Sequence, residues 1–336
     1  MTAVTGAGPW PGADALEAQT VVLGELGAPP DSVTGLPFAV VLGQRGPWAD
    51  LVGRTTALLV DLPAELGSHG WRLTARAGTD LSRARAFVRD DLDALAVAAH
   101  GWSGPLVVPV VGPVTLAATL DLARGDRVLG DPAALRDAAD SLAAGLTDHL
   151  AALLRAVPGA EPTVLVHEPL LAAAIDAQVP TFSGRATLRA VPVPVAGERV
   201  AAVVKAARDA GAAGATVHVG TSLVGLAAAQ AARADGVAVE LAAVRAAGWE
   251  LLAAAVEGGT ALWAQLGPAP RTPAGGPDLV RHAEQLTGPW SQVGLTAAGL
   301  DKVVLVVPGA DEPPTARRAL AEAVRAAQLV AERAAG

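Results

Sequence analysis

The chain alternates short runs rich in valine and leucine with longer, alanine-rich amphipathic stretches. Short apolar runs are typical of parallel strands buried on both faces, and the stretches between them are typical of the helices that connect such strands. Eight runs are predicted to be strands: Val4–Gly8, Leu36–Val41, Pro105–Val111, Thr163–His167, Thr216–Val219, Gly236–Glu240, Thr260–Leu266 and Lys302–Val307. Eight strands alternating with helices predict an α/β fold of one domain over residues 1–336, a (β/α)8 TIM barrel with parallel strands.

Helix signals support this pattern. Asp131 followed by Pro132 predicts an N-terminal cap for a helix over Ala133–Ala156. The link between the second and third strands is unusually long, and residues 61–103 are therefore expected to form an extended excursion. We predict a short irregular segment near Trp71–Ala77 and then a helix from Asp80 to Ala99.

Composition narrows the class of protein. Hydrophobic residues make up 51% of the chain and charged residues 17%, with a mean hydropathy of +0.40, so a large core is expected. The net charge is −8 and the basic residues are dispersed, which argues against a nucleic-acid partner. Apolar stretches are interrupted by charges, and the first residues lack the pattern of a secretion signal, so we expect no membrane partner and a cytoplasmic location.

The chain contains no cysteine. Disulfide bonds, thiol catalysis, iron–sulfur clusters and cysteine-bound zinc are therefore all excluded. This absence matters because of the motifs that follow the predicted strands.

Barrel enzymes carry their chemistry at the carboxyl ends of the strands. Polar and glycine-containing motifs lie at these predicted ends. The histidines away from the strand ends, at 69, 100, 149 and 282, are expected on the surface. The motifs are Gly6–Gly12, Gly112–Thr115, His167-Glu168-Pro169, His218–Gly220, Glu240 and Pro308–Asp311.

The order and spacing of these motifs resemble the catalytic barrel of cobalamin-independent methionine synthases, particularly their short, single-barrel actinobacterial forms. The segment Arg45–Asp50 also resembles the second-strand loop of that family. The resemblance implies a zinc ion held by a histidine, two cysteines and an acidic residue. That zinc would activate the thiol of homocysteine for methyl transfer from a methylated folate.

The chain departs from the family at several of these positions. His218 and Glu240 keep two ligand positions, whereas Gly220 and Ala310 stand where the two cysteines are expected. His167 replaces the aspartate that the family uses to hold the substrate ammonium. The following positions are candidates for a substrate pocket: Pro9, in place of a serine, Trp10, Arg45, Trp48, Asp50, Gly112, Thr115, His167 and Glu168.

We therefore expect a catalytically silent or repurposed barrel that binds a small molecule, an amino acid or a folate-like compound, without a cofactor. The alternative is an active methyltransferase that works without metal or on zinc held by a rebuilt site of His167, His218 and Glu240.

Structural roles compete with these functional ones. His218 could form a hydrogen bond with Glu240, and Glu240 could instead pair with Arg245. Trp10 and Trp48 could pack in the core or stack on an aromatic ligand. Glu168 is expected to fix the turn after its strand or to bind N–H groups at the rim, and Thr115 to cap the next helix or line the pocket.

Overall fold

A computed structural model describes all residues, 1–336. Eight strands form one sheet in which every neighbouring pair is parallel, in the order β2-β1-β10-β9-β8-β7-β6-β5. The strands are β1 (Ala3–Gly6), β2 (Thr34–Gly35), β5 (Ser103–Val111), β6 (Gly159–His167), β7 (Gly214–His218), β8 (Gly236–Glu240), β9 (Ala261–Gln265) and β10 (Val304–Val307).

The two ends of this sheet meet through the segment that follows β2. The N–H of Val107 in β5 donates to the carbonyl of Pro37 at 2.7 Å, and the N–H of Ala39 donates to the carbonyl of Val107 at 2.9 Å. The sheet is thus a nearly closed barrel, and the predicted (β/α)8 fold is confirmed.

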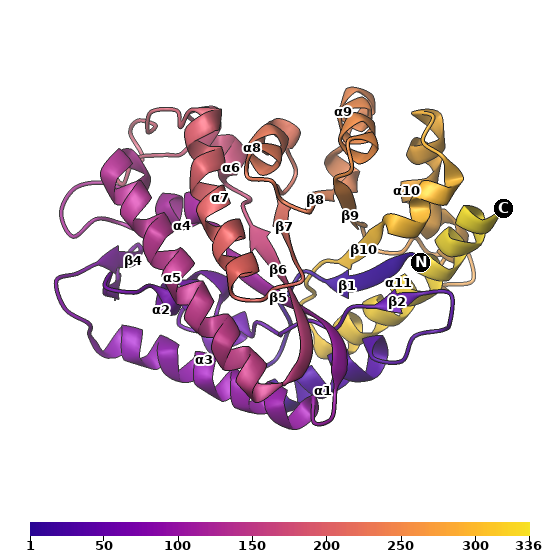
Figure 1. Cartoon of the computed structure of the whole chain (residues 1–336), viewed down its shortest axis with the longest axis horizontal. Coiled ribbons are helices and arrows are strands. Elements are labelled where there is room, and N and C mark those ends of the chain that lie inside the picture. The colour runs from indigo at the N-terminus through magenta and orange to yellow at the C-terminus, as the bar shows by residue number, and fades with distance from the viewer.

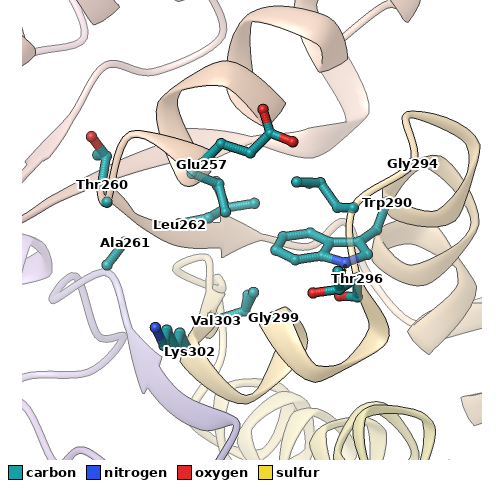
Figure 2. A pocket seen from close by; sticks show the side chains of 13 residues that line it. Glu257, Thr260, Ala261, Leu262, Trp290, Gly294, Thr296, Gly299, Lys302 and Val303 are labelled. Carbon is teal, nitrogen blue, oxygen red and sulfur yellow. Dashed lines mark hydrogen bonds between the residues drawn. The ribbon is translucent and has the colours of Figure 1, made fainter.

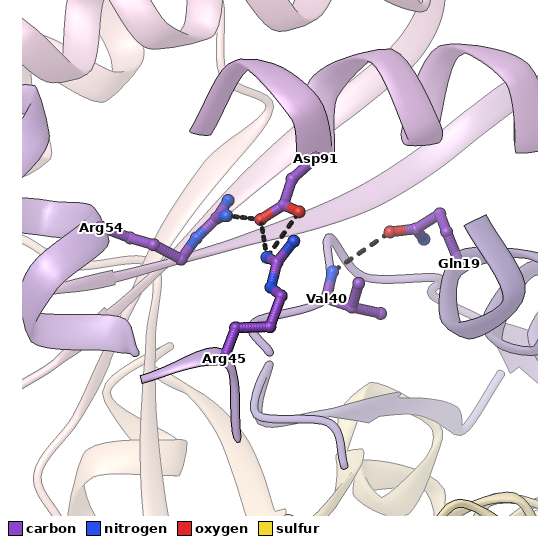
Figure 3. Close-up of polar contacts among 5 residues, drawn as sticks. All are labelled: Gln19, Val40, Arg45, Arg54 and Asp91. Carbon is purple, nitrogen blue, oxygen red and sulfur yellow. Dashed lines mark hydrogen bonds and ion pairs between the residues drawn. The ribbon is translucent and has the colours of Figure 1, made fainter. Parts of the chain in front are cut away.

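The predicted strand Leu36–Val41 is wrong as a continuous element. The two-residue strand β2 ends before this range, and within it only isolated bridges form, at Phe38 and Val41. Pro37 has no N–H to offer a ladder. Gln19, buried on the first helix, takes the place of a neighbouring strand. Its side chain donates to the carbonyl of Phe38. It also accepts from the N–H of Val40, as drawn in Figure 3.

Helices cover the outside of the barrel (Figure 1). They are α1 (Ala15–Leu26), α2 (Leu51–Leu58), α3 (Thr79–Ala98), α4 (Pro113–Thr119), α5 (Pro132–Ala156), α6 (Leu171–Ile175), α7 (Val193–Asp209), α8 (Leu226–Ala231), α9 (Ala246–Glu257), α10 (Leu279–Gln292) and α11 (Pro313–Ala335). Asp131 caps α5 as predicted, accepting hydrogen bonds from the N–H groups of Ala133 and Ala134. None of these helices combines the length and apolar character that crossing a membrane requires.

The long excursion contains an antiparallel hairpin, β3 (Ala64–Gly67) and β4 (Gly70–Leu73), followed by α3. The predicted helix from Asp80 to Ala99 agrees with α3 within a residue at each end. The hairpin replaces part of the irregular segment predicted near Trp71–Ala77, since Trp71 lies within β4. Its indole N–H donates to the carbonyl of Pro47 and fastens the hairpin to the loop before α2.

One continuous hydrophobic core fills the barrel and the layer between sheet and helices. Inside the barrel, Trp263 of β9 is buried beside Gly236 of β8. A Cβ atom at Gly236 would lie 2.9 Å from the hydroxyl of Thr216 and 3.2 Å from the Trp263 ring, so glycine leaves room for the indole.

Candidate functional site

Two histidines lie side by side at the carboxyl ends of β6 and β7. His167 and His218 are partners in the parallel register, and their ring centroids are 5.1 Å apart. The residues are 8% and 5% exposed, so both imidazoles are nearly removed from water. The predicted convergence of these two residues at one end of the barrel is therefore present.

Both imidazoles are uncharged at neutral pH. Burial, together with the neighbouring His218, lowers the pKa of His167 to about 3, and the backbone of Ala7 opposes the shift. Burial also lowers the pKa of His218 to about 4, against the effect of its hydrogen bond with Gln265. The His218 Nε2 atom lies 3.1 Å from Oε1 of Gln265 on β9, so this contact passes across β8 inside the barrel.

The histidine pair does not belong to a cluster of three potential metal ligands. No group of three histidine, aspartate or glutamate side chains is arranged to hold a metal ion, so Glu240 does not join His167 and His218 as the rebuilt site requires. The two other contacts considered for Glu240 are not formed in the structure. His218 bonds to Gln265, and half-buried Glu240 forms no ion pair with Arg245 or any other residue. Two neutral imidazoles supply fewer ligands than zinc ordinarily takes from a protein.

The two positions where the resemblance predicts cysteines have different surroundings. Gly220 has a φ of +70°, a conformation that side-chain-bearing residues rarely adopt, and a Cβ there would lie 3.3 Å from the backbone of Pro169. Ala310 follows β10 and lines a cavity against α10 and α11, among whose lining residues neither His167 nor His218 occurs.

Glu168 has the structural role that the sequence predicts. Its carboxylate is fully buried and accepts hydrogen bonds from the N–H groups of Val114 and Thr115, the first turn of α4, at 2.9 and 2.7 Å. A Cβ at Gly112 would lie 2.3 Å from this carboxylate, which explains the glycine. Burial raises the pKa of Glu168 to about 7, opposed by these donors. Thr115 does not cap α4; its hydroxyl accepts from the N–H of Leu170 at 3.1 Å.

Arg45 forms a buried ion pair with the helix α3. Its guanidinium binds both carboxylate oxygens of Asp91 on α3, at 2.6 and 2.8 Å, and Arg54 of α2 pairs with the same carboxylate (Figure 3). Burial, together with the charge of Arg45, lowers the pKa of Arg54 to about 10. These contacts join α2, α3 and the turn Gly43–Arg45 into one unit.

Trp10 and Trp48, which could pack in the core or stack on a ligand, both make packing contacts in the structure. Trp10 is buried against Phe38, with ring centroids 6.1 Å apart, and Pro9 pairs with Val41 in a backbone bridge. The Trp48 indole donates to Asp80 at 2.9 Å and is covered by the guanidinium of Arg83. We assign neither ring to ligand binding.

Asp50 caps the helix α2 and also lines a cavity. Its carboxylate accepts from the N–H of Gly53 at the start of α2, and burial raises its pKa. It also lines a cavity of about 490 Å³ between the β3–β4 hairpin and the segment around Val179, with Trp71 and Arg127. Apart from the residues of the β1 loop, Asp50 is the only predicted pocket residue that lines one of the main cavities.

Gln44, for which no sequence pattern predicts a role, joins two loops at the carboxyl end of the barrel. Its side chain accepts from the N–H of Gly12, after β1, at 2.9 Å and donates to the carbonyl of Asp311, after β10, at 3.0 Å. An amide that bridges two loops distant in sequence carries no local signal that could have revealed it.

A further cavity lies at the opposite end of the strands (Figure 2). It measures about 280 Å³ and has Trp290, Glu257 and Lys302 in its lining, next to the start of β9. The amino-terminal face of such barrels generally serves stability rather than chemistry, and we assign no site to it.

Comparisons with known proteins agree with the barrel geometry. No family model matches the chain, and no curated protein matches it. A solved B12-independent methionine synthase from Shewanella sp. W3-18-1, in complex with selenomethionine, matches with a TM-score of 0.59 and 11% identity, covering 98% of this chain and 97% of that one. A 2,3-dimethylmalate lyase matches with 11% identity over 91% of this chain and 75% of that one, at a TM-score of 0.37. The fold is thus a methionine-synthase-like barrel.

Proposed function

We propose that this methionine-synthase-like barrel binds a small molecule and does not perform zinc-dependent methylation of a thiol. The observation that carries the proposal is the buried pair His167 and His218, which no carboxylate joins. Neutral imidazoles are the form that binds metals, so protonation is not the obstacle. The obstacle is the number of ligands and the absence of a negatively charged one.

The polar groups that an amino-acid substrate would need at the barrel mouth are also different. A neutral imidazole at His167 supplies no counter-charge for a substrate ammonium, because burial keeps its pKa at about 3. Pro9 offers neither a hydroxyl nor an N–H to a carboxylate. We infer that homocysteine has no binding site of the family type here.

One observation favours the alternative of a rebuilt metal site. The Nε2 atom of His167 and the Nδ1 atom of His218 are buried without a hydrogen-bond partner. Unpartnered buried polar atoms need an explanation, and a metal ion that also recruited Glu240 would supply one. This alternative requires Glu240 to adopt another arrangement.

Metal analysis separates the two functions. The protein is purified without chelators or immobilised-metal resin, incubated with zinc, desalted and measured by mass spectrometry of the metal. We expect substoichiometric zinc, the same in His218→Ala as in the control His100→Ala, whose histidine is exposed. Stoichiometric zinc that His218→Ala removes and His100→Ala retains would establish the alternative.

Activity provides a second measurement. Transfer of a methyl group from methylated folate to homocysteine is expected to stay at background, with or without added zinc, because no metal holds the thiolate. Turnover that disappears in His218→Ala would contradict the proposal.

A further inference from the structure

The cavity that Asp50 lines has the size of a ligand pocket. It lies between the β3–β4 hairpin and α2 on one side and α6 with the segment around Val179 on the other, and it measures about 490 Å³. Neither His167 nor His218 belongs to its lining. A ligand placed here rests on the small-molecule binding proposed above, but not on whether the histidine pair holds a metal.

The two walls of this cavity are held in place by their own contacts. Trp71 fastens the hairpin to Pro47, as described above. At the tip of the hairpin, the ring of His69 meets the ring of Phe182 edge-on, with centroids 5.1 Å apart, so the hairpin touches the segment that follows α6. His69 is exposed, as the sequence predicts, whereas the same expectation is wrong for His282, which is buried on α10.

Apolar side chains make up much of the lining. They are Val52 of α2, Leu66 of β3, and Leu170, Ala173 and Val179 from α6 and its flanking residues. Removing apolar surface of this kind from water is favourable, and a hydrocarbon group would do so. The ligand that fits the cavity therefore has an apolar body.

The lining contains one carboxylate without a cation to neutralise it. Arg127, the lining's only arginine, already forms an ion pair with Asp121 at 3.0 Å. Half-buried Asp50 takes part in no ion pair. Its Oδ1 atom accepts from the N–H of Gly53, and the start of α2 supplies only partial positive charge.

This charge makes a cation the favoured ligand. Burial raises the pKa of Asp50, because the ionised carboxylate is incompletely solvated. A partly buried charge is costly unless a charge of opposite sign pairs with it. A cation that entered the cavity would supply that partner.

We propose that this cavity binds a primary amine that has an apolar body and no carboxylate. Asp50 pairs with the ammonium group, and the body lies against Val52, Leu66 and Val179. A carboxylate on the ligand would find no free cation, because Asp121 occupies Arg127. The ligand is thus neither an α-amino acid nor an anionic, folate-like compound.

Calorimetric titration of the full chain near neutral pH tests this with three probes built on the same benzyl group. Benzylamine carries the ammonium, benzyl alcohol replaces it with a neutral hydroxyl, and L-phenylglycine adds a carboxylate to the carbon that bears the amine. We expect benzylamine to bind, and each of the other two to bind at least about tenfold more weakly. If either of them binds as tightly as benzylamine, or if benzylamine does not bind, the proposal is wrong.

A charge variant with a matched control locates the ammonium. Asp50→Asn keeps a residue that caps helices as well as aspartate does, but removes the charge. It should weaken benzylamine at least about tenfold. Asp131→Asn makes the same change in the cap of α5, outside the lining, and should leave the affinity unchanged.

A second pair of variants locates the apolar body. Ala173→Leu fills the cavity and should abolish binding, whereas Ala172→Leu, on the same short helix but outside the lining, should leave it intact. Binding that survives both Asp50→Asn and Ala173→Leu places the amine elsewhere and overturns the assignment. The zinc content of the His218→Ala protein is measured separately, so failure of the amine to bind is distinguished from failure of the function proposed above.

Discussion

The buried pair His167 and His218 makes stability depend on pH in a predictable direction. Their pKa values are lowered to about 3 and about 4 in the folded protein, whereas an unfolded histidine titrates near its model value of 6.5. Between these values the unfolded chain binds more protons, so the free energy of unfolding falls as the pH is lowered from about 6.5 towards 4. Above about pH 7 this contribution is constant.

The prediction is that His218→Gln reduces this dependence. Between about pH 6 and pH 5, the unfolding free energy of the wild type should fall more steeply than that of the variant, by about 1 kcal/mol per pH unit. Urea denaturation at each pH measures both slopes. Glu168, whose raised pKa acts in the opposite direction, is present in both proteins and cancels. Exposed His100→Gln should keep the wild-type slope, and equal slopes in all three proteins would contradict the prediction.

At the scale of elements, the start of α4 depends on the fit between a glycine and a carboxylate from β6. Because Glu168 occupies the space beside Gly112, Gly112→Ala should displace the carboxylate from the N–H groups of the first turn. We expect a loss of about 3 kcal/mol or more, since buried donors lose their partner and the packing is strained.

The matched control is the same substitution at Gly24, exposed in the last turn of α1, where an added Cβ would meet nothing within 4 Å. Gly24→Ala should stabilise the protein by about 0.5 to 1 kcal/mol, because alanine has the higher helix propensity. Chemical denaturation of both variants gives the comparison. Similar effects at the two positions would show that Gly112 is not required by Glu168.

Elements with a strong local pattern could be predicted, and those held by distant partners could not. The buried runs Pro105–Val111 and Gly236–Glu240 correspond closely to β5 and β8. The strand at Leu36–Val41 failed because Gln19 and β5 satisfy its backbone instead of a full ladder. The hairpin of β3 and β4 has no comparable apolar run, so only its position in a long link was foreseeable.

The same division applies to the candidate site. The role of Glu168 follows from neighbouring motifs at adjacent strand ends, and the structure agrees with it. The partner of His218 is Gln265, two strands away across the barrel, and no spacing in the sequence indicates that contact. The cavity that Ala310 lines, against α10 and α11, is likewise built from two strand ends and two helices, which only the assembled fold brings together.

At the scale of the whole molecule, the closure of the barrel depends on few backbone hydrogen bonds. The N–H groups of Val107 and Ala39 make the bonds that join the two ends of the sheet. We predict that both exchange with deuterium as slowly as the amides of the neighbouring strand β6, because closure makes them part of one cooperative unit. Amide exchange followed by NMR measures this. Exchange of these two amides at the rate of unprotected loops would indicate an open sheet.

The amide of Gln44 has a consequence for communication across the protein. Its oxygen accepts from the N–H of Gly12 at the barrel mouth, and its nitrogen donates to the carbonyl of Asp311. Asp311 lines the same cavity between β10, α10 and α11 as Ala310 does. The loop after β10 is thus joined to the loop after β1 by this side chain, in addition to the close approach of Gly309 to Pro9. If a ligand at one of these places changes the affinity for a ligand at the other, thermodynamic reciprocity requires the same factor in the opposite direction.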